Sequence, residues 1–335
     1  MTKAAVKKTY QVAGIGNAIV DVISTVDDHF LERMDIHKGI MQLIERDRAE
    51  TLYDAMDDRA EASGGSVCNT IVGAGALGLK TALIGRVRDD ALGQFFAADT
   101  KRTGTAFVNP PVSGGELPTS RSMIFVTPDG ERSMNTYLGI SAEVGPDDVD
   151  EAIMADTEVL FLEGYLFDKD KGKEAFLKAG RACRAAGGRV GIALSDPFCV
   201  DRHRSDFRAL VANEMDYVIG NEQEWTSLYQ VNDLDEALAL AAADCDIVVC
   251  TRSGDPVVLI HNGHRVEAKV NKVVPVDATG AGDQFAAGFL FGLVGDHSLE
   301  TCGRMGCIAA AEVIGHIGAR PQQDVLALFK AEGLI

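Results

Sequence analysis

The segment Asp277-Ala278-Thr279-Gly280-Ala281-Gly282-Asp283, followed at 284–293 by the apolar run QFAAGFLFGL, decides the fold of this chain. The glycines leave main-chain N–H groups uncovered, and the run after them predicts a helix that begins there. The first N–H groups of a helix lack an intrahelical partner and carry roughly half a positive charge, so they favour a phosphate. Asp283, in the first turn, is placed to accept a proton from a hydroxyl that attacks this phosphate.

The alternative interpretation is a glycine-rich turn that only caps a core helix, with Asp283 as a favourable first-turn acid. The pattern D-x-T-G-A-G-D is too specific for that to be the better explanation. Its fixed positions, at roughly 5–10% usage each, coincide by chance on the order of once in 10⁶–10⁸ positions.

The run D-A-T-G-A-G-D-Q-F-A-A-G-F resembles the C-terminal signature of the ribokinase-type (PfkB-type) carbohydrate and nucleoside kinases. The resemblance implies that Asp283 is the catalytic base. It implies that the amides of Gly280, Ala281 and Gly282 form an anion hole, and that Asp277 and Thr279 belong to the nucleotide site.

Composition agrees with a globular enzyme of this kind. The 335 residues, 46% of them hydrophobic, suffice for one large or two modest domains. The net charge of −18 argues against nucleic acid or an anionic membrane surface as a partner. A nucleotide must therefore be compensated locally, by Mg²⁺, by helix N-termini and by a few basic side chains.

Cysteine usage and hydropathy bear on the compartment. The seven cysteines form no C-x-x-C pair and lie mostly in apolar stretches, which is typical of reduced core thiols. The basic residues 1–8 are followed by no apolar segment of a secretion signal, and no run of 18 apolar residues occurs. We therefore expect a cytoplasmic protein without membrane spans.

Strand-like and helix-like segments alternate along most of the chain, which predicts a mostly parallel sheet covered on both faces. We expect the α/β, ribokinase-like three-layer sandwich that the resemblance implies. The expected strands are 10–16, 81–87, 159–162, 189–194, 217–219 and 247–251, with an antiparallel pair at 257–260 and 264–268. The expected helices are 47–60, 67–77, 91–103, 171–186, 234–243, 284–293 and 301–314.

The segment 119–137 breaks this alternation, because two strand-like runs flank the turn Pro128-Asp129-Gly130. Together with 22–45 it predicts a small β-sheet that acts as a lid. We expect the lid to comprise 23–46 and 113–140, inserted into a large domain of 9–22, 47–112 and 141–335. Arg132 on this hairpin would reach the transferring phosphoryl group on lid closure, although a solvated strand arginine explains it as well.

Two segments in the first quarter are similar to the substrate-binding elements of the family. A Gly-Gly turn at 64–65 opens an apolar helix, and the first strand ends in polar residues, where ligands of open α/β sheets bind. Taken alone, structural turns explain both segments about equally well. The resemblance implies that substrate hydroxyls are held by Asn17, Asp21, Gly64, Gly65, Ser66 and Asn69.

Two later strand ends complete the expected nucleotide site. Asn221-Glu222-Gln223-Glu224 matches the N-x-x-E element of the family, whose glutamate orders the water shell of Mg²⁺. First-turn carboxylates are also stabilised by the helix dipole alone. Thr251-Arg252-Ser253-Gly254 resembles the turn beside the nucleotide phosphates, with Ser253 where glycine is usual. The resemblance implies ATP and Mg²⁺ as cofactors, leaves a monovalent cation such as K⁺ open, and implies nucleotide contacts from Asn221, Thr251, Arg252 and Gly254.

Segments 35–45, 64–66, 164–166 and 194–198 are similar to the adenosine-kinase-like branch. An adenine ring needs flat apolar walls, and the expected contacts are Ile19, Tyr165, Leu166 and Phe198, with Gln42 at the base of the lid. Each of these side chains alone is more often a core residue. The favoured function is phosphoryl transfer from ATP to the 5′-hydroxyl of adenosine, by a monomer or homodimer. The alternatives are a kinase for ribose, fructose or an acidic sugar, and a non-catalytic nucleoside- or nucleotide-binding protein.

Overall fold

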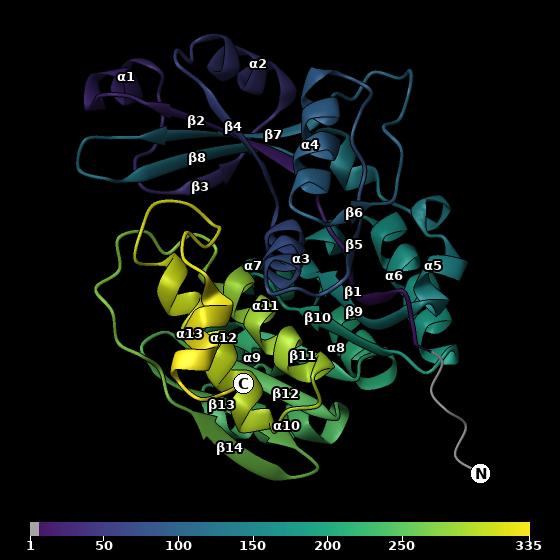
Figure 1. Ribbon diagram of the computed structural model, residues 1–335. Helices are drawn as coiled ribbons and strands as arrows, with labels where there is room; N and C mark the ends of the chain where they lie inside the picture. Colours follow the sequence, from purple (N-terminus) through teal and green to yellow (C-terminus); the bar gives the residue numbers. More distant parts are fainter. Residues whose placement is uncertain (1–6) are drawn as a thin grey trace.

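The computed structural model describes residues 7–335, so most of the basic segment used above for the cellular location lies outside it. Its strands form two sheets, and Figure 1 shows the smaller sheet above a larger α/β body. Within the described residues, none of the helices combines the length and the apolar character needed to span a bilayer.

The large sheet has nine strands in the order β14-β13-β12-β11-β10-β9-β1-β5-β6. All neighbouring pairs are parallel except β12–β13 and β13–β14, which are antiparallel. The strands are β1 (Tyr10–Ile15), β5 (Thr81–Ile84), β6 (Ala106–Phe107), β9 (Thr157–Glu163), β10 (Arg189–Ala193), β11 (Tyr217–Asn221), β12 (Ile247–Arg252), β13 (Asp255–His261) and β14 (His264–Ala268).

Two hydrophobic cores cover the two faces of this sheet, because successive strand residues point to opposite sides. Val12 and Ala13 of β1, for example, belong to different cores. One face carries α3 (Ser66–Ala76), α4 (Ala91–Arg102), α11 (Ala281–Val294) and α12 (Leu299–Val313), with α13 (Val325–Ala331) packed on α12. The other carries α5 (Glu151–Ala155), α6 (Asp170–Ala185), α7 (Pro197–Arg202), α8 (Arg204–Glu214), α9 (Glu222–Tyr229) and α10 (Leu234–Asp244). The predicted three-layer α/β fold is thus confirmed.

The small sheet has the order β3-β8-β7-β2-β4, and we call it the lid sheet. Its strands are β2 (Ile19–Thr25), β3 (Met41–Leu43), β4 (Ala60–Gly64), β7 (Ser120–Val126) and β8 (Arg132–Tyr137). The helices α1 (Asp28–Arg33) and α2 (Arg46–Asp54) pack on its outer face, as Figure 1 shows. Short 3₁₀ turns at Gly139–Glu143 and Pro146–Asp148 lead back into the large body, and a third, Gly164–Asp168, follows β9.

The expected boundaries of the lid differ from this arrangement in two places. The predicted helix 47–60 ends at Asp54, because 60–64 is the strand β4, which pairs antiparallel with β2. The boundary expected between 22 and 23 falls inside β2, so residues 19–22 also belong to the lid sheet. Both differences arise from a long-range strand pairing that local propensity does not report.

The first strand and the helix α3 pack in direct contact because Gly14 has no side chain. A Cβ at this position would lie 2.5 Å from side-chain atoms of both Val67 and Ile71. Those two side chains are completely buried, so they have little room to move.

Replacement of Gly14 by alanine should therefore destabilise the protein by about 1–3 kcal/mol through overpacking. The matched control is Gly254→Ala, where an added Cβ meets no atom within 4 Å. Urea unfolding of both variants tests this expectation, and equal midpoints for the two would contradict it.

Candidate active site

Asp283 lies where the N-termini of two helices meet. It occupies the first turn of α11, and both of its carboxylate oxygens accept hydrogen bonds from α3. Ser66 Oγ donates to Oδ1 at 2.7 Å, and Asn69 Nδ2 donates to Oδ2 at 3.0 Å. Three of the predicted site residues are thus in direct contact, although Asp283 is more than 200 positions away from Ser66 and Asn69 in the sequence.

Burial raises the pKa of several carboxylates in this region, among them Asp283 and Asp21. Burial raises the pKa of Asp283 to about 6, against the lowering effect of the hydrogen bonds from Ser66 and Asn69. Burial also raises the pKa of Asp21 to about 6, against the charges of Arg132 and Arg320, and the negative charge of Asp283 adds to this rise. A carboxylate with such a pKa is well suited to act as a general base near neutral pH.

The backbone before Asp283 forms an open cradle of amides. Gly280 adopts a left-handed conformation with φ of 79°, and a Cβ there would lie 2.6 Å from Ala319 Cα. Within the described residues, the N–H groups of Gly280, Gly282 and Asp283 have no hydrogen-bond acceptor. The expected contribution of Ala281 is wrong in this detail, because its N–H donates to the carbonyl of Ala278 at 3.2 Å.

Two cavities meet at this cradle and share Asn221, Thr251 and Gly282. The smaller one, about 200 Å³, reaches Ser66, Asp283 and Glu224. The larger one, about 600 Å³, lies between β12, α11 and α12 and has a mostly apolar lining that includes Val257, Phe285 and Ile314. A cavity of this size and character suits the nucleoside part of a nucleotide.

Arg132 joins the lid sheet to the loop at 277–280 that precedes Asp283, which we call the anion-binding loop. Its guanidinium donates to Asp277 Oδ2, and both side chains are almost fully buried. Asp277 also accepts the N–H groups of Thr279 at 2.9 Å and Gly318 at 3.0 Å. Burial acts to raise the pKa of Asp277, but these hydrogen bonds and Arg132 hold it below its ordinary value. Asp277, which the resemblance assigned to the nucleotide site, therefore holds the loop at 277–280 and the lid together.

Asn221 and Glu224 form a reciprocal cap at the start of α9. Asn221 Oδ1 accepts the N–H of Glu224, while the two oxygens of Glu224 accept the N–H and the amide group of Asn221. Burial raises the pKa of Glu224 to about 7. The two side chains thus hold each other in the helix cap, and both residues also line the smaller cavity.

The residues present fit a Mg²⁺ ion that is held mainly by phosphates and water. Within residues 7–335, no cluster of three or more acidic, histidine or cysteine side chains forms a metal site. Glu224 is the carboxylate of the smaller cavity that lies beside Asn221 and Thr251, so it would contact such an ion through water. Arg252 lines the larger cavity with Ser253 and Gly254, and it pairs with Glu222 at 2.8 Å.

Asn17 does not present its amide to the cleft. Its Nδ2 donates to Glu163 Oε1 at 2.6 Å, and its Oδ1 accepts from Ser141 Oγ at 2.9 Å. Asp21, in contrast, has no hydrogen-bond partner in the described part of the chain, and Gly64 opposite provides the space for its carboxylate. Gly65, with φ of 101°, begins α3 and lies over the carbonyl of Asn17.

The residues expected around a base are only partly placed as predicted. The prediction that Leu166 contacts a base is wrong, because Leu166 is buried in the core beneath α6 and α7. The prediction for Gln42 is also wrong, because its side chain lies on the outer face of the lid sheet and donates to Asn135. Phe198 is 71% exposed, and the hydroxyl of Tyr165 donates to the carbonyl of Ser195. Ile19 shares the inner face of the lid sheet with Asp21.

Two residues near the site escaped the sequence interpretation. Glu163 ends β9, and a glutamate directly after an apolar strand was a usable signal. Arg320 lies in the loop after α12 and donates to Ser63 and to Asp99 at the base of the lid. No local pattern marks Arg320, because its partners are more than 200 residues away.

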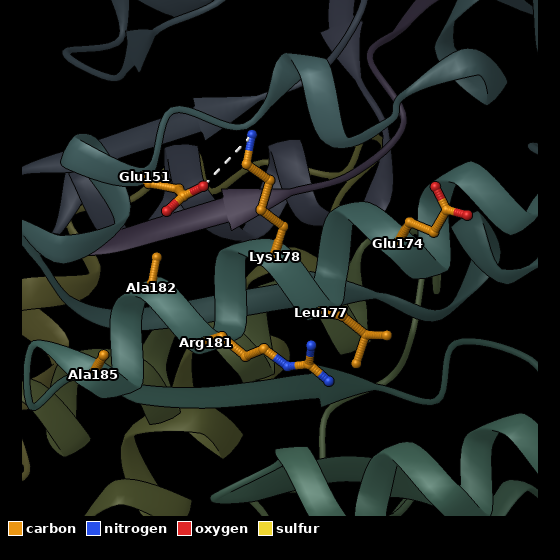
Figure 2. Close-up of a pocket in the computed structure, with 7 residues that line it drawn as sticks. All are labelled: Glu151, Glu174, Leu177, Lys178, Arg181, Ala182 and Ala185. Atoms are coloured by element: carbon orange, nitrogen blue, oxygen red, sulfur yellow. Dashed lines mark ion pairs between the residues drawn. The ribbon is translucent and has the colours of Figure 1, made fainter.

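A separate depression of about 560 Å³ lies on the surface of α5 and α6, on the opposite face of the large sheet from α11 (Figure 2). Glu151 and Lys178 face each other across it at 3.9 Å. Its other lining residues, which Figure 2 shows along α6, include no further acid–base pair, so we assign it no chemistry.

Comparisons with known proteins identify the family of this chain. Residues 12–325 match the family described as pfkB family carbohydrate kinase. The solved structure of adenosine kinase from Sinorhizobium meliloti is 46% identical, covers 97% of this chain and 99% of its own, and superposes with a TM-score of 0.88. A probable sugar kinase from Rhizobium etli is 45% identical, with coverage of 98% and 100% and a TM-score of 0.89. The 5-dehydro-2-deoxygluconokinase of Shouchella clausii is 25% identical over 80% of this chain and 85% of its own. The chain belongs to the pfkB family of carbohydrate kinases, which are ATP-dependent enzymes that phosphorylate hydroxyl groups.

Proposed function

We propose that this enzyme transfers the γ-phosphoryl group of Mg·ATP to the 5′-hydroxyl of a nucleoside, with adenosine as the favoured substrate. The observation that carries the proposal is the chemistry of the inner face of the lid sheet. Strand pairing places Asp21, Ser122, Thr136 and Leu43 in one row across that face. The next row is Ile23, Ile124, Met134 and Met41.

This face combines one carboxylate with a broad apolar surface. Met41 and Leu43 are 49% and 55% exposed although they point to the same side as Asp21. A carboxylate without a partner suits a vicinal diol, whereas exposed methionine and leucine side chains suit a flat ring. A nucleoside offers both parts, and a simple sugar offers only the diol.

The remaining residues support phosphoryl transfer to an alcohol. Asp283 would accept the proton of the attacking hydroxyl, and the free amides of Gly282 and Asp283 would hold the charge of the transferred group. Mg²⁺, ordered through water by Glu224, would supply charge neutralisation for the phosphates when bound. Arg132, now paired with Asp277, is the nearest candidate for a cation from the lid.

A sugar kinase is the second candidate. Arg132 and Arg320 both lower the pKa of Asp21, so two guanidinium groups lie near the expected hydroxyl site. Such an arrangement would also favour an acidic sugar. A cytoplasmic location, a monovalent cation requirement and the oligomeric state stay predictions from the sequence. A role in purine salvage would follow from adenosine as the substrate.

Asp283→Asn should lower kcat by about 10²-fold or more, because the base is lost while the shape is kept. The KM for the nucleoside should change little, since Asp21 and Gly65 remain. Steady-state kinetics with adenosine and Mg·ATP measure both constants. Asp148→Asn is the matched control, because burial also raises the pKa of that half-buried carboxylate, which lies outside both cavities. Near-normal turnover of Asp283→Asn would remove the mechanism.

The pH dependence follows from the raised pKa values of Asp283 and Asp21, each about 6. As the pH falls through about 6, these carboxylates take up protons, and the base can no longer accept one from the substrate. We expect kcat/KM to be constant above this range and to fall about tenfold per pH unit below it. The apparent pKa values of the profile belong to Asp283 and Asp21 as a coupled pair. A profile flat down to pH 4.5 would exclude Asp283 as the base.

Substrate choice is tested by variants of the lid. Met41→Ser and Leu43→Ser should raise the KM for adenosine by about 10-fold, because each removes an apolar contact with the base. Leu240→Ser, at a position 41% exposed on α10, is the control for general effects of the substitution. ATP consumption should also be measured with ribose, fructose and an acidic sugar. If a sugar is turned over faster than adenosine, and the lid variants leave that rate unchanged, the enzyme is a sugar kinase.

A further inference from the structure

Glu163 is a buried carboxylate next to the active site that the proposed mechanism does not use. It ends β9, is 1% exposed, and lines neither of the two cavities. Its oxygens accept three N–H groups. Oε1 accepts the main-chain N–H of Asn17 at 3.1 Å and the side-chain Nδ2 of Asn17 at 2.6 Å, and Oε2 accepts the N–H of Val67 at 3.0 Å.

A carboxylate is the side chain that this position requires. Both of its oxygens accept hydrogen bonds, whereas glutamine of the same length would turn an NH₂ group toward an N–H donor. In the described residues no cation pairs with Glu163, and burial raises the pKa of its carboxyl to about 7, against the lowering effect of the hydrogen bonds from Val67 and Asn17. The space is reserved as well, because a Cβ at Gly16 would lie 2.5 Å from Oε2.

The hydrogen bond from Val67 to Glu163 lies in the same helix turn as the two side chains that contact Asp283. Val67 is the neighbour of Ser66 and lies two residues before Asn69, and those two side chains donate to Asp283. Through Asn17, the same carboxylate also fixes the end of β1. Glu163 therefore connects the loop after the first strand to the first turn of the helix that orients Asp283.

We propose that Glu163 is a positioning residue for phosphoryl transfer: its carboxylate fixes the first turn of α3 and so directs Ser66 and Asn69 toward Asp283. This inference rests on the proposed function, in which Asp283 is the base. Glu163 itself touches neither the acceptor nor the nucleotide cavity.

Several other charged or titratable groups face this region. Asp21 faces Asp283 from β2, and Arg132 and Arg320 face Asp21 from β8 and from the loop after α12. Tyr165 is near Asp283, Glu163, Glu224 and Asp196. None of these groups accepts a hydrogen bond from α3. A pH shift that arises through Ser66 can therefore be distinguished from one that arises through their charges.

The direction of a pH shift distinguishes positioning from a charge effect. Hydrogen bonds from Ser66 and Asn69 lower the pKa of Asp283. If Glu163→Gln loosens α3, these bonds weaken, and the acid limb of kcat/KM moves to higher pH. Glu163, with a pKa of about 7, carries little charge near pH 6. If it acted only through that charge, its removal would leave the limb in place or move it to lower pH.

The experiment measures pH profiles of Glu163→Gln, Ser66→Ala and the double variant, with adenosine or the best acceptor of the panel. We expect Glu163→Gln to lower kcat about tenfold with a KM change below about threefold, and to move the acid limb up by about 0.5 pH unit. Ser66→Ala should give a similar profile. In the double variant the two losses should be less than additive, because Glu163 acts in part through the hydrogen bond that Ser66→Ala removes.

Two further variants complete the test. Glu163→Asp keeps the charge but shortens the side chain, so it should also move the limb upward, and it serves if Glu163→Gln does not fold. Glu312→Gln is the matched control, since Glu312 is also buried and accepts two main-chain N–H groups, those of Gln322 and Gln323. It should lower thermal stability without moving the limb.

An unmoved or downward-shifted limb in Glu163→Gln, a wild-type profile in Glu163→Asp, or fully additive losses would overturn the inference. Asp283→Asn separates this from a failure of the proposed function: if that variant stays active, the base assignment itself is wrong.

Discussion

The site depends on the contact between two helix N-termini, in which Ser66 and Asn69 of α3 donate to Asp283 of α11. This contact brings the Gly-Gly turn at 64–65 and the amide cradle at 280–283 to the same place. Without it, a buried aspartate next to Asp21 would be destabilised by both burial and repulsion. The glycines of both turns allow this approach, since Gly64 leaves room for the carboxylate of Asp21 and Gly280 packs against Ala319.

The lid sheet is joined to the same cradle from above. Arg132 reaches from β8 to Asp277, whose carboxylate also holds the N–H groups of Thr279 and Gly318. The anion-binding loop, the loop after α12 and the lid are therefore held by one carboxylate. A phosphate bound by Arg132 would have to compete with Asp277 for the guanidinium, so in the proposed mechanism nucleotide binding would act on the position of the lid.

Much of this arrangement could be predicted from the sequence because its signals are local. The parallel sheet, the hairpin at 119–137, the helix after Gly282 and the antiparallel pair β13–β14 follow from hydrophobic period and turn residues. The residues that sequence missed or misplaced depend on long-range pairing. Residues 60–64 become a strand only because β2 lies beside them, and Gln42 faces outward because the pairing of β3 with β8 sets its side. Arg320 and Glu163 gain their roles from partners far away in the chain.

The order of strands in the large sheet also has a consequence for solubility. An open sheet of nine strands has two free edges, each able to recruit another chain. One edge is β6, which has only two residues, and the other is β14, where Arg265 bonds to Asp235 and Glu267. Shortness at one end and charge at the other leave no long apolar edge on which a foreign strand could add, so this large sheet is protected against aggregation through its own backbone.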